Sequence, residues 1–409
     1  MSVGKEEWTI GDIPRRSVTP VGEVCPHTPY QFTMKEVQSI MEQNIVWVDF
    51  DLLENFMADV FMGLGVPEED ARICAEVLIT ADKRGIDSHG INRMKPIYYD
   101  RIKEGIQFPV TNFEVIREGP TTAVIDGHDG MGHVIAKKAM AMAIEKASKY
   151  GMGMTAVRNS THYGIAGYYA TMATDRGMIG ITGTNARPSI APTFGVENML
   201  GTNPLTFGIP TDEEFPFVLD CATSITQRGK IEVYEKLGKE LPEGWVIDEN
   251  GNTRTDTSQV LKDLVKGTAA LTPLGGIGEL TGGYKGYGYA TVVEILSAAL
   301  QGGSYLKMLL GYENGKKVPY HLGHFFIAID VSAFTDLESF KKTAGDILRS
   351  LRASKKMPGH DRIYTAGEKE YLAWLERKDK GVPLNRELQK ELIIMRDELK
   401  LTKYRFPFE

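Results

Sequence analysis

The sequence has few cysteines, no long apolar run and no excess of positive charge, and each of these absences excludes a class of protein. Three cysteines among 409 residues, Cys25, Cys74 and Cys221, are too few and too scattered for a disulfide framework or a thiolate zinc site. No stretch approaches the roughly 18 uninterrupted apolar residues of a membrane-spanning helix. The formal net charge of −7 argues against a nucleic-acid or anionic-membrane partner, although a local cluster of cations can still bind a small anion.

The rest of the composition is that of an ordinary globular protein. Hydrophobic residues make up 42% of the chain and charged residues 25%, so a large core can be buried. The cysteines are expected as free thiols in a reducing compartment. Lys5, Glu6 and Glu7 near the start replace the apolar segment that a signal peptide would need. A soluble, cytoplasmic protein is therefore expected.

Three regions are expected along the chain. Residues 1–45 have little apolar periodicity and are interpreted as an extension. Residues 46–120 place apolar residues at helical spacing and predict a small helical domain, which the C-terminal helices of 335–409 continue. Residues 121–334 alternate between strand-like and helix-like segments, which predicts an α/β core that binds cofactor and substrate.

One segment of this core resembles a dinucleotide-binding fingerprint without completing it. A predicted strand at 121–126 precedes Gly130 and Gly132, but Ile135 stands where the third glycine belongs. No acidic residue follows the next strand at the required distance. A Rossmann site at Gly130 is therefore not expected, and a nucleotide would have to be held elsewhere.

The segment Asp82–Arg93, DKRGIDSHGINR, has the residue types that a proton-transfer site for an anionic substrate needs. It follows a predicted helix, and its glycines permit a tight turn that presents Ser88, His89 and Arg93 together. Histidine exchanges protons near neutral pH, and the planar guanidinium of arginine binds carboxylates through two hydrogen bonds. Ser88 can set the tautomer of His89 or contact a substrate. The competing interpretation is a helix end at which these side chains satisfy free carbonyls.

A second histidine occupies a turn between a predicted strand and a predicted helix. His162 lies in Arg158–Gly167, RNSTHYGIAG, where free backbone N–H groups attract phosphate or carboxylate. It can contact a cofactor or a substrate. Alternatively, Ser160 and Thr161 build an N-capping turn and His162 is merely exposed.

Two further segments suit a cofactor. Asp220 ends an apolar strand, where a carboxylate is costly unless it is paired or functional, and it can orient a histidine or a ribose hydroxyl. The run 275–288, GGIGELTGGYKGYG, leads into a helix, and its glycines let the backbone approach a phosphate beside Lys285.

Metal binding is the competing use of the histidines. His321 and His324 are three residues apart, and His128 and His133 are five apart, but neither pair has a convincing third ligand. No metal is expected, and no serine-hydrolase elbow or P-loop lysine motif is present.

In this order, the segments resemble the type 2 malate/L-lactate dehydrogenase family. The matching stretches, within roughly residues 50–365, are RGIDSHGINR, NSTHYGIAGYYA, GTNPLTFGIP, LDCATS, GYKGYGYATVVEILSAAL and GHFFIAID. That family also includes sulfolactate, ureidoglycolate and 2,3-diketogulonate dehydrogenases and cyclic imino-acid reductases. The resemblance implies a non-Rossmann α/β fold, with a large mixed β-sheet core, flanking helices and a small helical N-terminal domain, assembled as a homodimer. The extension and the charged tail beyond Arg362 are expected to be longer than in the usual chain.

The resemblance also implies roles for single residues. Proton exchange falls to His89 or to His162, which also borders the nicotinamide, while Arg93 holds the substrate carboxylate; Ser88 and Asp220 complete the catalytic set. The cofactor is NAD, the first choice, or NADP. Its expected contacts are His162, Tyr163, Gly164, Ile165, Ala166, Asn185, Asp220, Cys221, Ala222, Lys285, Gly286, Gly288, Gly359, His360 and Asp361.

The leading hypothesis is an NAD(P)-dependent oxidoreductase that interconverts a small 2-hydroxy acid, malate or L-lactate first, and its 2-oxo acid. A rival within the family is a ureidoglycolate or sugar-acid dehydrogenase, or a cyclic imino-acid reductase. A rival from another class is a catalytically silent nucleotide-binding protein, against which the joint presence of His89, Arg93 and His162 argues. Malate would need a second cation, for which the sequence offers Lys83, Arg84, Arg158 and Arg187.

Overall fold

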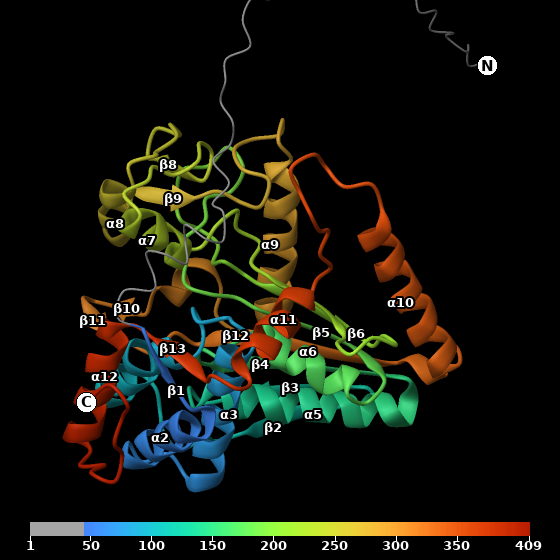
Figure 1. The fold of residues 1–409 in the computed structure, drawn as a ribbon, viewed down its shortest axis with the longest axis horizontal. Helices are drawn as coiled ribbons and strands as arrows, with labels where there is room; N and C mark the ends of the chain where they lie inside the picture. The colour runs from blue at the N-terminus through green and yellow to red at the C-terminus, as the bar shows by residue number, and fades with distance from the viewer. Residues whose placement is uncertain (1–44) are drawn as a thin grey trace, which may run out of the picture. The chain divides into compact units, whose positions relative to one another are not determined.

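The helical part of the fold is built from both ends of the described chain. The computed structural model describes residues 45–409, so the extension expected at 1–45 lies almost wholly outside the described residues. The elements of the helical part are β1 (Val46–Val48), α2 (Phe50–Gly63), α3 (Glu68–Lys83), the 3₁₀ turn η1 (Ile91–Arg93), the π-helix η2 (Met94–Tyr99), α4 (Asp100–Lys103), α11 (Glu368–Arg377), β13 (Val382–Leu384) and α12 (Arg386–Glu398). β1 pairs antiparallel with β13, and Phe56, Leu78 and Leu392 share one hydrophobic core. The charged tail is therefore a packing element, whose outer helix α12 lies beside α2 in Figure 1.

A mixed sheet of seven strands forms the centre of the remaining fold. Its strands are β2 (Glu114–Glu118), β3 (Thr122–Asp126), β4 (Met152–Ser160), β5 (Met178–Thr184), β6 (Leu205–Ile209), β7 (Phe217–Cys221) and β12 (Leu322–Asp330). Their spatial order is β2-β3-β4-β12-β5-β6-β7, and only β3 and β4 run parallel to each other. This order differs from that of a Rossmann sheet, so the predicted fold class is confirmed.

Helices cover both faces of this sheet. α5 (Gly132–Tyr150) and α6 (Ala166–Thr174) bury Phe326 and Ala328 of β12 in one core. α9 (Gly283–Ala298) packs on the opposite face, where Gly323 of β12 allows the helix backbone to approach closely. Because the strand is buried on both sides, its run of apolar residues is nearly continuous.

The remaining elements connect β7 to α9 and α9 to α10. They are α7 (Arg228–Lys236), β8 (Val246–Asp248), α8 (Thr257–Lys266), β9 (Ala269–Leu271), the 3₁₀ turns η3 (Ala299–Gln301), η4 (Leu306–Leu310) and η5 (Val331–Ala333), and the hairpin β10 (Tyr312–Glu313) and β11 (Lys316–Lys317). The Gly-rich run thus follows a small unit of α7, α8, β8 and β9 that composition did not reveal.

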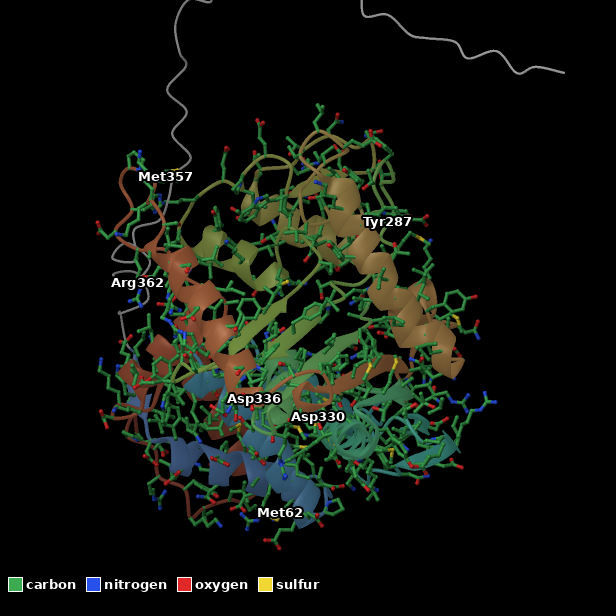
Figure 2. All side chains as sticks on the ribbon, turned by 90° about the vertical axis from the view of Figure 1, so that its right-hand side faces the viewer. Met62, Tyr287, Asp330, Asp336, Met357 and Arg362 are labelled. Carbon is green, nitrogen blue, oxygen red and sulfur yellow. The ribbon has the colours of Figure 1, made fainter. Side chains whose placement is uncertain are left out.

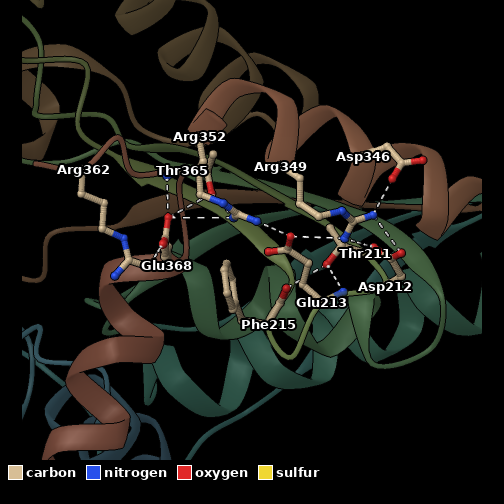
Figure 3. A network of polar contacts seen from close by, with 10 residues as sticks. All are labelled: Thr211, Asp212, Glu213, Phe215, Asp346, Arg349, Arg352, Arg362, Thr365 and Glu368. Carbon is tan, nitrogen blue, oxygen red and sulfur yellow. Dashed lines mark hydrogen bonds and ion pairs between the residues drawn. The ribbon is translucent and has the colours of Figure 1, made fainter. Parts of the chain in front are cut away.

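Ion pairs attach α10 (Leu337–Ala353) to the edge of the sheet. Only two residues of this helix are buried. Figure 3 shows Arg349 bonded to Asp212 and Arg352 bonded to Glu213, both in the turn between β6 and β7. α10 therefore stands beside the sheet edge, whereas α11 and α12 pack with the helical part to which the whole C-terminal region was assigned. The division into domains at 46–120 and 121–334 stays a prediction, because residues 45–409 belong to one compact unit.

The packing around Gly132 gives a structural reason for the glycines Gly130 and Gly132, which resemble part of a dinucleotide-binding fingerprint. A Cβ on Gly132 would lie 2.3 Å from the carbonyl oxygen of Thr161 and 2.5 Å from that of His162. The hydroxyl of Thr161 accepts a hydrogen bond from the Gly132 N–H and donates one to the Gly130 carbonyl. The glycine is thus needed for close packing of the α5 start against the segment that carries His162.

Gly132→Ala should lower the free energy of unfolding by about 1–3 kcal/mol, because the added methyl overpacks a rigid backbone contact. Urea denaturation monitored by circular dichroism measures this change. Gly229→Ala, in α7, is the matched control. A Cβ added at Gly229 would have no heavy atom within 4 Å, so this variant should be slightly more stable than wild type. Equal stability of both variants would contradict the close approach at Gly132.

Candidate active site

The turn that follows α3 is held closed from inside. The buried Asp82 carboxylate accepts a hydrogen bond of 2.9 Å from the Ile91 N–H, and a Cβ on Gly90 would lie only 1.9 Å from Asp82 Oδ1. Burial raises the pKa of Asp82 well above its usual value. Gly90 therefore permits a compact turn, called the SHG turn after Ser88, His89 and Gly90, which presents Ser88 and His89 at its rim.

Arg377 of α11 clamps the same turn from outside. Its guanidinium nitrogens lie 2.5 and 2.9 Å from the two carboxylate oxygens of Asp87, and one also donates to the Asp82 carbonyl at 2.7 Å. This planar, two-pronged contact is the geometry that arginine supplies and lysine does not. The C-terminal helix therefore takes part in positioning the His89 turn, a role that sequence spacing gave no sign of.

His89 and His162 come together although they are 73 residues apart in the chain. Their ring centroids are 5.8 Å apart and their planes differ by 20°. Ser88 Oγ lies 2.9 Å from Nδ1 of His89, and the hydroxyl of Tyr98 lies 2.6 Å from Nδ1 of His162. A hydroxyl group at Nδ1 thus orients each ring, and neither Nε2 atom has a hydrogen-bond partner within residues 45–409.

The backbone sets the tautomer of His162. The Gly164 N–H points at His162 Nδ1 over 3.3 Å, and an amide N–H can only donate. Nδ1 is therefore an acceptor, also towards the Tyr98 hydroxyl, and the neutral ring carries its proton on Nε2. His89 is not constrained in this way, since a serine hydroxyl can accept from Nδ1 and leave a free lone pair on Nε2.

Both imidazoles are electrically neutral near neutral pH. Burial, with the positive charge of Arg93, lowers the pKa of His89 from 6.5 to about 4. Burial, followed by His89, Arg101, His133 and Arg93, lowers the pKa of His162 well below its usual value. Desolvation and surrounding positive charge act in the same direction here, so the site favours a bound anion.

Positive side chains surround the histidine pair. Arg93 donates from Nε to the Ser88 carbonyl at 2.5 Å, which leaves the end of its guanidinium available. Arg101 in α4 lies over the ring of Tyr320, and its charge and that of exposed Arg187 act on each other. The three other cations proposed for a second carboxylate are Lys83, Arg84 and Arg158, whose partners are Glu54, Thr171 and Asp126.

Asp220 has a different set of contacts from the one expected. Its carboxylate accepts from the Gly167 N–H at 2.7 Å and from the Thr206 hydroxyl at 3.0 Å, at the start of α6. The orienting partner of His89 is Ser88, so the expectation that Asp220 orients this ring does not match the geometry. Asp220 does line a cavity of about 320 Å³, together with Phe215 and Trp374.

The residues expected at the cofactor divide into buried and accessible groups. The side chains of Tyr163, Ile165 and Ala166 are buried in the α5/α6 core, and Gly164 adopts φ +79° against His133. Both ends of the Asn185 amide are engaged, because Oδ1 accepts from the Gly323 N–H at 2.8 Å and Nδ2 donates to the Ser304 carbonyl at 3.0 Å. These positions can offer a cofactor backbone groups or shape, but little side-chain chemistry.

The accessible group lies around the ends of β7 and α9. Lys285 is exposed in the first turn of α9, and no acid within residues 45–409 lies within ion-pair distance of it. Gly286 packs against Leu274, and Gly288 faces open space. The Leu274 N–H bonds to the carbonyl of Thr223, which ties this loop to the segment after Cys221 and Ala222. Gly359, His360 and Asp361 are exposed between Met357 and Arg362, both labelled in Figure 2.

Within residues 45–409 no group of three histidine, cysteine, aspartate or glutamate side chains is arranged to hold a metal ion. His324 is buried and bonds through Nδ1 to the Thr184 hydroxyl at 2.7 Å, a structural contact. No helix in this range is long and apolar enough to cross a membrane.

The sequence profile of the malate/L-lactate dehydrogenase family matches residues 48–393. The chain belongs to this family. It is 45% identical over 352 residues to malate dehydrogenase from Pyrococcus horikoshii, covering 86% of this chain and 95% of that protein. It is 38% identical to L-sulfolactate dehydrogenase from Methanocaldococcus jannaschii, covering 85% and 96%. The crystal structure of malate dehydrogenase from Entamoeba histolytica aligns with a TM-score of 0.85 at 46% identity, covering 89% of this chain and all of that one.

These similarities establish a nicotinamide-dependent hydroxy-acid dehydrogenase. They also correct one expectation: the family match runs to residue 393, so the tail beyond Arg362 belongs largely to the family. Tyr98, Arg101 and Arg377 were missed by motif analysis. Tyr98 and Arg101 lie three residues apart just after the SHG turn, which was the available signal.

Tyr98→Phe should lower kcat by about tenfold, since the loss of one buried hydrogen bond, about 1–1.5 kcal/mol, frees the His162 ring. Steady-state kinetics with saturating cofactor measures this. Tyr99→Phe is the neighbouring control, because the Tyr99 hydroxyl donates to Glu398, away from the site. If both variants keep the wild-type kcat, Tyr98 does not orient the catalytic ring.

Proposed function

We propose that the chain interconverts malate and oxaloacetate with NAD. The observation that carries this proposal is the stacked pair His89 and His162, with Arg93 and Arg101 beside it. Two imidazoles that are neutral and oriented can exchange a proton with a hydroxyl group, and the cations can hold carboxylates. The names of the P. horikoshii and E. histolytica relatives support malate as the substrate.

The surroundings of β7 and α9 suit a dinucleotide. Lys285 is exposed in the first turn of α9, and its ammonium group, which has no acid within ion-pair distance in residues 45–409, suits a pyrophosphate. The cavity beside Asp220 offers the flat side chains of Phe215 and Trp374 for a ring. Glu214 in its wall can accept ribose hydroxyls and would repel an extra phosphate, which favours NAD over NADP. NAD held by these residues would supply the hydride acceptor for C2 of malate and, in its reduced form, the hydride donor for oxaloacetate.

In this proposal Arg93 binds the C1 carboxylate and so places the C2 oxygen between the two histidines. During oxidation, the proton on the C2 oxygen passes to the lone pair on His89 Nε2, with Ser88 accepting from Nδ1. His162 donates its Nε2 proton in a hydrogen bond to the same oxygen and fixes its direction. In the reverse reaction, protonated His89 returns the proton to the oxygen that becomes the hydroxyl group.

The first experiment compares substrates. Purified protein should oxidise reduced NAD in the presence of oxaloacetate, monitored by absorbance, in buffer containing EDTA. Pyruvate, a cyclic imino acid and, in the oxidative direction, ureidoglycolate are the comparison substrates. Turnover of only the imino acid or only ureidoglycolate would replace the proposal by the corresponding family activity. Binding of NAD without turnover of any substrate would identify a silent nucleotide-binding protein.

A homodimer in the cytoplasm is part of the same proposal. α9 and the segment after it expose large apolar side chains, among them Tyr289, Ile295, Tyr305 and Met308. Exposed apolar surface of this kind is typical of protein contacts, and we assign it to a second copy of the chain. Light scattering should give twice the chain mass of 45.4 kDa. A monomeric mass at working concentration would reject this assignment.

The pH dependence of malate oxidation should reveal the low pKa of His89. The base must be neutral, and a pKa of about 4 keeps it neutral at all higher pH. After correction for the ionisation of malate, kcat/KM should stay constant below pH 6.5 and fall only as the pH approaches about 4. A decline centred near 6.5 would show a solvated histidine instead.

His89→Ala and His162→Ala provide the controls for that assignment. His89→Ala should lower kcat by about 10²–10⁴-fold and remove the fall of kcat/KM at low pH, the acidic limb of the pH profile. His162→Ala should also lower kcat but retain the limb, because the His89 base is still present. Loss of the limb in His162→Ala alone would move proton transfer to His162.

A further inference from the structure

Arg101 is a largely buried cation for which the described part of the chain provides no anionic partner. Its guanidinium carbon lies 4.5 Å from the centroid of the Tyr320 ring, and burial lowers the pKa of Arg101. Within residues 45–409 no carboxylate lies within ion-pair distance of it. Glu104, the nearby acid, is already bonded to Lys317 at 2.6 Å. Burying a positive charge without a counter-charge is unfavourable, so the arrangement is unusual unless an anion completes it.

Arg101 lies near the catalytic histidines. It belongs to α4, which continues directly from the π-helix that carries Tyr98, and its charge acts on both Tyr98 and His162. Tyr98 itself bonds to His162. The charge of exposed Arg187, in the segment that follows β5, also acts on Arg101. The Asn185 amide anchors that segment through Ser304 and Gly323.

A purely structural role explains less of this arrangement. A cation–π contact with Tyr320 stabilises one face of the guanidinium. It does not account for the second positive charge, that of Arg187, which acts on Arg101, because like charges repel and an anion between them would offset the repulsion. The ring of Tyr320 acts instead as a platform that holds the guanidinium plane while its edge stays free.

We propose that Arg101, supported by Arg187, binds the second anionic group of the substrate, while Arg93 binds the first. The inference rests on the proposed function and names its substrate class: 2-hydroxy acids with an additional carboxylate or sulfonate at the far end. L-Lactate and pyruvate, which lack that group, leave Arg101 without an anion. Selectivity for dianions then depends on one residue outside the SHG motif.

The test compares Arg101→Met with wild type on oxaloacetate, sulfopyruvate and pyruvate. Methionine keeps most of the side-chain length and can still pack on Tyr320 without the charge. We expect kcat/KM for oxaloacetate to fall by about 10- to 100-fold, as for lost hydrogen bonds to a charged group, and kcat/KM for pyruvate to stay within about twofold. Arg101→Lys should recover part of the loss. Arg117→Met, at an exposed position on β2, is the matched control.

Each result decides the proposal. Equal losses on oxaloacetate and pyruvate, or no loss on either, would overturn it. A loss on oxaloacetate without a loss on sulfopyruvate would restrict the subsite to carboxylates, and the reverse would restrict it to sulfonates. An unfolded variant would show in its thermal transition, and Tyr320→Leu, which keeps the charge but removes the platform, should then give a smaller loss of the same selectivity.

Ligand-induced stability separates this inference from the proposed reaction. With NAD present, malate should raise the melting temperature of wild type more than L-lactate does, and Arg101→Met should lose that difference. If wild type turns over no substrate but shows this behaviour, the subsite stands and the proposed reaction fails. If malate and L-lactate stabilise wild type equally, the subsite is overturned whatever the activity.

Discussion

The hydrogen bond between Tyr98 and His162 joins the two halves of the site, and the other contacts of the site act around it. Tyr98 belongs to the helical part, whereas His162 follows β4 of the mixed sheet. A 2.6 Å contact in a buried environment fixes the distance between these halves and the ring orientation together. The stacking of His89 on His162, and the approach of Arg93 and Arg101, depend on that placement.

The electrostatics of the site oppose those of the whole chain. The protein carries a net charge of −7, yet Arg93, Arg101 and Arg187 gather where desolvation already keeps His89 and His162 neutral. Screening by water is weak in such surroundings, so local charges dominate over the mean. An anion that enters contributes the missing negative charge. The arginines that bind its charged groups therefore also orient the substrate.

Close backbone contacts provide the rigidity that this arrangement requires. Gly90 lets the SHG turn fold against Asp82, and Gly132 lets α5 meet the backbone of the His162 segment. Arg377 then fastens the turn from the C-terminal helix, which explains why residues distant in sequence belong to one site. The π-helix Met94–Tyr99 lies between Arg93 and Arg101, and such segments often occur at functional sites because they change the facing of the residues that follow.

The sequence by itself determined the elements with strong periodicity, the failure of the fingerprint at Gly130, and the residues of the SHG turn. Those features depend on neighbours in the chain, so local spacing reveals them. Tertiary structure alone decided that Asp220 bonds at the start of α6, that both ends of the Asn185 amide are bonded, and that Arg101 has no counter-charge among residues 45–409. These outcomes depend on contacts between residues far apart in the chain, such as Asn185 and Gly323, which are 138 positions apart. Sequence spacing does not reveal which distant group will bond to a given polar side chain.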